Sequence, residues 1–130
     1  MTMQDQGAGT GEDLESIVAR VAFDSKGLIP AIIQEEVSRD VLMLGYMDAK
    51  ALRRTLTEGR VTFWSRSRGE YWRKGDTSGS RQYVRGAALD CDGDALLVTV
   101  HQIGPACHTG AHACFEVDPL QPVLGSEHDD

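Results

Sequence analysis

The chain has 130 residues, of which 41% are hydrophobic and 25% charged, a composition typical of one globular domain that buries its own core. Its formal net charge of −7 disfavours general binding to nucleic acid. The most apolar windows, VLMLGYM and ALLVTV, are far shorter than the roughly 18 residues of a membrane span, so we expect no membrane partner.

Residues 1–12 are polar, acidic and glycine-rich, and they predict a disordered tail. They lack the basic segment and apolar run of a secretory signal, so we expect a cytoplasmic protein whose three cysteines stay reduced. The folded domain is predicted over residues 13–118. A second polar tail is predicted over residues 119–130.

The first predicted helix follows the tail, because Leu14, Ile17, Val18 and Val21 recur at helical spacing. We expect this short amphipathic helix to pack on a sheet. The next two segments, AIIQEEV and DVLMLGYM, are rich in β-branched and apolar residues and predict a hairpin.

A second helix is predicted to begin after Asp48, whose side chain can cap it, and to end at Gly59. Four strand-like segments follow: VTFWSRS, EYWRKG, RQYVRGAALDC and ALLVTVHQI. We therefore predict an α+β fold dominated by antiparallel β-sheet, with two short helices.

Basic residues are concentrated in the middle of this acidic chain. Only Glu70 and Asp76 oppose them there, and the local net charge of +5 favours an anionic small-molecule substrate. The alternative is a solvated hairpin face. Seven of the thirteen basic residues belong to this segment: Arg60, Arg66, Arg68, Arg73, Lys74, Arg81 and Arg85.

The segment LDCDGD places Asp90, Asp92 and Asp94 at alternate positions, with Cys91 between the first two. In an extended strand the carboxylates would share one face, where they suit Mg²⁺ or Ca²⁺, and Cys91 would point to the other face. A calcium-binding EF-hand loop is excluded, because its sixth and twelfth positions would hold Ala95 and His101. The alternative is that Asp-Gly makes a plain hairpin turn.

A second cluster, GPACHTGAHACF, contains Cys107 and Cys114 with His108 between them. With Cys91 they would give a tetrahedral zinc three thiolates and an open position for water, which zinc acidifies. His108 is our hypothesis for the general base. Two buried structural cysteines without metal are the alternative reading.

Three segments together, WSRSRGEYWRKGDTSG, DCDGDALL and GPACHTG followed by CF, resemble the signatures of the phosphoribosyl-AMP cyclohydrolase family. The resemblance covers about Leu28 to Phe115. Three positions depart from the family pattern: Gly45 replaces the usual alanine, Asp76 the usual glutamate, and Ser80 a frequent asparagine.

The resemblance implies an intertwined homodimer with one Zn²⁺ per subunit, bound by Cys91 of one subunit and by Cys107 and Cys114 of its partner. It implies Mg²⁺ on Asp90, Asp92 and Asp94. It also implies hydrolysis of the N1–C6 bond of 1-(5-phosphoribosyl)-AMP, a step of histidine biosynthesis. A purine nucleotide deaminase and a non-catalytic, zinc-stabilised binding module remain as alternatives. The candidate substrate-binding residues are Arg66, Arg68, Arg73, Lys74, Thr77, Ser78, Gly79 and Trp64.

Overall fold

The computed structural model describes residues 12–76 and 78–125. Of the predicted tail over residues 1–12, only Glu12 is described. Thr77 and residues 126–130 also lie outside the described residues. The described elements, in chain order, are α1 (Leu14–Ala19), β2 (Ile29–Glu35), β3 (Val41–Met47), α2 (Ala49–Glu58), β4 (Thr62–Ser65), β5 (Glu70–Arg73), β6 (Gln82–Leu89), β7 (Leu96–Gln102) and the 3₁₀ turn η1 (Cys114–Glu116).

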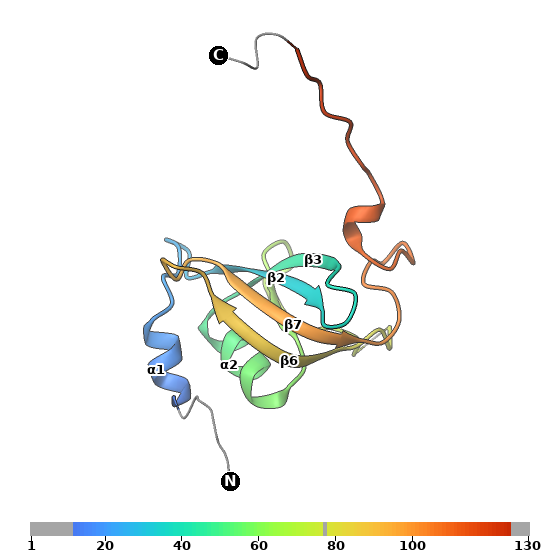
Figure 1. Cartoon of the computed structure of the whole chain (residues 1–130). Helices are drawn as coiled ribbons and strands as arrows, with labels where there is room; N and C mark the ends of the chain where they lie inside the picture. Colours follow the sequence, from blue (N-terminus) through green and yellow to red (C-terminus); the bar gives the residue numbers. More distant parts are fainter. Residues whose placement is uncertain (1–11, 77, 126–130) are drawn as a thin grey trace.

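Four strands form one twisted sheet in the order β3-β2-β7-β6, and β4 and β5 form a separate antiparallel ribbon (Figure 1). The β2–β3 and β6–β7 pairs are antiparallel, as predicted, whereas β2 and β7 pair in parallel. The α+β class with a mostly antiparallel sheet and two helices is thus confirmed. The parallel pair and η1 were not anticipated.

One face of the sheet forms the core. Ile29, Ala31 and Ile33 of β2 are fully buried, and Val98 and Val100 of the adjacent β7 continue the same face. Burial of alternate residues fits a sheet that is covered on one side. The covering elements are α2 and the β4–β5 ribbon, which contribute the buried side chains of Leu52 and Phe63, among others.

Helix α2 begins and ends where the sequence predicted. The Asp48 carboxylate accepts a hydrogen bond from the Ala51 amide at 2.8 Å, which satisfies one of the free amides of the first turn. Gly59 closes the helix with a left-handed φ of 74°, a conformation that glycine adopts without strain.

Helix α1 differs from the prediction, because it packs chiefly against α2 and not on the sheet. None of its residues is fully buried, and Val21, which was expected to extend it, lies in the core beyond its end. A bidentate pair joins the helices, with Arg53 donating to Glu15 at 2.8 and 2.9 Å. Within the described residues, no helix has the length and apolar character needed to cross a membrane.

Candidate active site

After β7 the chain forms a tight loop that brings Cys107 and Cys114 near each other. The amides of Ala106 and Cys107 donate to the carbonyls of His112 and Ala111, at 3.1 and 3.2 Å, so the loop doubles back on itself. Turn η1 then begins at Cys114. Cys107 is buried and Cys114 half-buried, which makes this loop the one segment in which two thiols share a protected environment.

The two thiols differ in acidity. The Thr109 hydroxyl donates to Cys107 Sγ at 3.1 Å, and this hydrogen bond lowers the pKa of Cys107. Burial raises the pKa of Cys114, and the negative charge of Cys107 raises it further. A soft metal ion binds both groups as thiolates, so its binding releases protons. The donor set fits zinc, because thiolates are its preferred structural and catalytic ligands.

Lys74 is the cation next to this loop. Its Nζ donates to the Ala106 carbonyl at 2.7 Å, and only 6% of the residue is exposed. Burial lowers the pKa of Lys74, an effect that the nearby Cys114 and Cys107 oppose.

A cleft of about 550 Å³ joins the cysteine loop to the basic ribbon. Cys107 and His108 line it, together with Trp72 and Arg68. Arg68 has 60% of its side chain exposed, so its guanidinium is accessible to an anion. Of the substrate-binding residues predicted from the sequence, the cleft is lined by Arg68, Arg73, Lys74 and Ser78.

Two other predicted substrate-binding side chains lie elsewhere. Arg66 stacks over the ring of Tyr46 at 3.9 Å, and Trp64 packs edge-on against Tyr71 with ring centroids 4.9 Å apart. Neither is among the described residues that line the cleft. Gly79 belongs to the turn beside it, where its amide donates to the Gly75 carbonyl at 2.9 Å.

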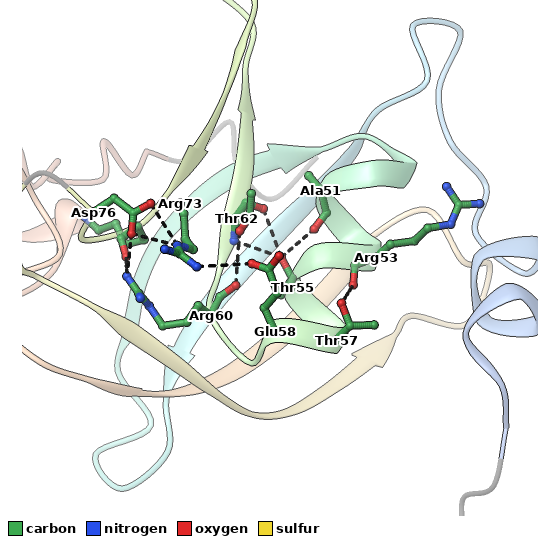
Figure 2. Close-up of polar contacts among 10 residues, drawn as sticks. Ala51, Arg53, Thr55, Thr57, Glu58, Arg60, Thr62, Arg73 and Asp76 are labelled. Carbon is green, nitrogen blue, oxygen red and sulfur yellow. Dashed lines mark hydrogen bonds and ion pairs between the residues drawn. The ribbon is translucent and has the colours of Figure 1, made fainter.

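Arg73 is held in a charge network at the base of the ribbon (Figure 2). Asp76 accepts hydrogen bonds from Arg73 Nε at 2.9 Å and from Arg60 at 3.1 Å, and Glu58 lies 3.6 Å from Arg73. Hydrogen bonding to Arg73 is the main cause of the lowered pKa of Asp76. Arg60 also donates to the Lys74 carbonyl at 3.0 Å, so the network fixes the turn that carries the cleft residues.

The second predicted metal site lies in the turn between β6 and β7. The expectation of an extended strand is wrong, because residues 91–94 form a turn. The Asp90 carboxylate accepts from the amides of Asp94 and Ala95 at 3.0 and 3.2 Å, and Gly93 adopts a left-handed φ of 76°. These contacts curl the backbone, and the chain cannot stay extended.

The turn nevertheless gathers the three carboxylates. Oxygen atoms of Asp90, Asp92 and Asp94 lie within 4.8 Å of one another, and all three residues are exposed. Hydrogen bonding with Asp92, then with Asp90, raises the pKa of Asp94, and their negative charges add to the effect. Three clustered oxygen donors fit Mg²⁺, which relieves the repulsion among them.

The predicted zinc ligands are not assembled within one chain. Among residues 12–76 and 78–125, the three aspartates are the only trio of His, Cys, Asp or Glu side chains that comes close enough to hold an ion. Cys91 lies in the turn before β7, whereas Cys107 and Cys114 lie after the end of this strand. A strand of seven residues separates the two sets by roughly 20 Å.

Comparison with known proteins identifies the relatives of this arrangement. The family model described as "PRA-CH: Phosphoribosyl-AMP cyclohydrolase" matches residues 43–116. The phosphoribosyl-AMP cyclohydrolase of Leifsonia xyli is 67% identical over 112 residues, 86% of this chain and 90% of the relative. That of Bifidobacterium longum is 66% identical over 110 residues, 84% of each chain. That of Frankia alni is 62% identical over 110 residues, 85% of this chain and 83% of the relative.

Fold, site and relatives together define a small α+β hydrolase. The chain belongs to the phosphoribosyl-AMP cyclohydrolase family.

Proposed function

We propose that the protein hydrolyses the N1–C6 bond of the adenine ring in 1-(5-phosphoribosyl)-AMP, giving the formimino-aminoimidazole carboxamide ribotide of histidine biosynthesis. The observation that carries the proposal is the high identity with cyclohydrolases over most of the chain. The cleft supports it, because thiols, a histidine and exposed cationic side chains surround one space large enough for a nucleotide.

The proposed metals follow the two donor sets. Cys107 and Cys114 would bind Zn²⁺ together with Cys91 of a second copy, and Asp90, Asp92 and Asp94 would bind Mg²⁺. Zinc with three thiolate ligands would lower the pKa of a water molecule and so supply the nucleophile near neutral pH. The burial of Cys107 and the tight loop that it shares with Cys114 support a shared metal.

In the proposed reaction, water adds to C6 of the purine, which substitution at N1 has already made electrophilic. His108, exposed on the cleft beside Cys107, accepts the proton of this water. The tetrahedral carbon then collapses with rupture of the N1–C6 bond, and N1 takes up a proton. Both nitrogens stay in the product, so no ammonia is released.

The cleft residues account for recognition of the two phosphate groups. Arg68 offers an exposed guanidinium, and Ser78 offers a hydroxyl and an amide in the adjoining turn. Mg²⁺ on the aspartates of a partner would hold further phosphate oxygens. Arg66, Arg73, Lys74, Thr77, Gly79 and Trp64 remain predicted substrate ligands that the structure does not test.

A homodimer is part of the proposal, because the site is incomplete in one chain. The roughly 20 Å between Cys91 and the cysteine loop cannot be closed by side-chain motion. Large apolar side chains are also exposed on η1 and on the segment after it, which extends away from the body of the molecule (Figure 1). Phe115 is 61% exposed and Leu120 is 84% exposed, a pattern typical of surfaces that another chain covers.

The test is incubation of zinc-loaded protein and Mg²⁺ with phosphoribosyl-AMP, while the ultraviolet absorbance and the ammonia concentration are followed. We expect the purine absorbance to change without ammonia release, and we expect Cys107→Ser to be inactive. Stoichiometric ammonia would identify a deaminase. A stable complex without turnover would identify a binding module, and either result would overturn the proposal.

A further inference from the structure

Lys74 lines the cleft, but its ammonium is engaged with the cysteine loop. Only 6% of the residue is exposed, and its Nζ already donates to the Ala106 carbonyl at 2.7 Å. Arg68 in the same cleft is exposed, with 60% of its side chain accessible. The Lys74 ammonium faces the cysteine loop, so its partner should be sought there.

A buried ammonium is costly unless a negative charge lies near it. Within residues 12–76 and 78–125, Lys74 forms no salt bridge with any aspartate or glutamate. The groups whose charge acts on it are Cys114 and Cys107. The geometry links Lys74 to the same loop, because its Nζ donates to the carbonyl of Ala106, the residue before Cys107.

The position of Lys74 is fixed from both ends. Its amide donates to the Val61 carbonyl at 2.9 Å, which ties its backbone to the residue before β4. Its Nζ lies over the Trp72 ring, 5.5 Å from the centroid, in cation–π geometry. The side chain thus bridges the ribbon and Ala106, the residue that immediately precedes Cys107.

We propose that Lys74 is a positioning residue for the thiolate pair, whose ammonium fixes the loop through Ala106 and offsets the charge of Cys107 and Cys114. The inference rests on the zinc site of the proposed function. Three thiolates around a divalent ion leave one net negative charge, and a single buried ammonium neutralises it. Removing that charge should weaken metal binding, since such outer partners hold ligands in their binding geometry.

The test compares zinc dissociation constants of the full-length protein, measured by chelator competition after metal removal. Lys74→Met keeps the length of the side chain but removes its charge and donors, Lys74→Arg keeps the charge, and Lys26→Met is a matched surface control. We expect a loss of affinity of about tenfold or more for Lys74→Met and a loss of less than about threefold for Lys74→Arg. Lys26→Met should bind like the wild type.

Cobalt substitution separates an electrostatic role from simple anchoring of the loop. A nearby positive charge lowers the energy of the sulfur lone pairs, so its loss should move the sulfur-to-cobalt charge-transfer band of Lys74→Met to longer wavelength. An unchanged band, or unchanged zinc affinity, would overturn the inference. If Lys74→Met fails to fold, Lys74→Gln replaces it in both measurements. Wild-type protein that binds no zinc would overturn the proposed metal site and this inference with it.

Discussion

Cys91 and Cys107 lie beyond opposite ends of β7, the first in the turn before Leu96 and the second in the loop after Gln102. The seven-residue strand between them keeps the two thiols too far apart to reach one ion in the same chain. In a dimer with a two-fold axis, each chain can give Cys91 to one site and Cys107 to the other, and both sites are identical.

Replacing His108 tests the proposed general base. We expect His108→Ala to lower kcat by about 100-fold or more, because removal of a general base typically costs that much, while bound zinc stays unchanged. His101→Ala is the matched control, since His101 lies on β7 near Glu36 and outside the cleft lining. Turnover and zinc content are measured on the same samples. Near-normal turnover of His108→Ala would remove His108 from the mechanism.

Loss of one carboxylate from the acidic turn should stabilise the metal-free protein and reduce the stabilisation by Mg²⁺. Asp92→Asn removes negative charge next to Asp94, whose pKa is raised chiefly through Asp92, so the metal-free protein should become more stable. The same change removes an Mg²⁺ ligand, so the rise in Tm on addition of Mg²⁺ should shrink. Thermal unfolding with and without Mg²⁺ measures both effects. An undiminished Mg²⁺ response would argue against a metal site in this turn.

Asp76 should contribute to stability in a pH-dependent way. Its native pKa lies below the ordinary value, so its contribution is present above the unfolded pKa and is lost as pH falls through the native value. We expect Asp76→Asn to lower Tm at neutral pH and to flatten the fall of Tm below about pH 4. Asp118→Asn, at an exposed position after η1, serves as the control. If the Tm of Asp76→Asn fell at acidic pH as steeply as that of the wild type, the role of the Arg73–Asp76 pair would be contradicted.

Gly45 should be required by the packing of this particular core. A Cβ at this position would overlap the ring of Phe63, which lies against β3 from the β4–β5 ribbon. We expect Gly45→Ala to lower the free energy of unfolding by about 1–3 kcal/mol, the usual effect of overpacking. Gly86→Ala, where a Cβ meets open space, should cost much less. Urea unfolding measures both, and the double variant Gly45→Ala/Phe63→Leu should recover part of the loss.

Local features of the fold were predictable from the sequence because each depends on a short stretch of chain. Asp48 and Gly59 define the ends of α2 through their own side chain and backbone. The β2–β3 hairpin follows from alternating apolar runs. The parallel pairing of β2 with β7 was not predictable in this way, because it joins segments some 65 residues apart through packing on a common core.

The residue types of the candidate site were predictable from the sequence, but their arrangement in space was not. The three carboxylates do lie together, as predicted. They are brought together by a turn that Asp90 stabilises and not by the alternation of side chains along a strand. Thr109, which bonds Cys107, could have been found from its place two residues after that thiol. Lys74 could not have been assigned to the cysteine loop, because nothing local distinguishes a buried lysine from the exposed arginines around it.

The most direct measurement mixes two inactive variants, Cys91→Ser and Cys107→Ser, after they are unfolded together and refolded with zinc. If thiolates from two chains share each metal, a mixed dimer contains one intact site and one doubly defective site. Random pairing should then restore about a quarter of wild-type activity and of bound zinc. If all three cysteines act within one chain, no combination restores an intact site, and the mixture will stay as inactive as its components.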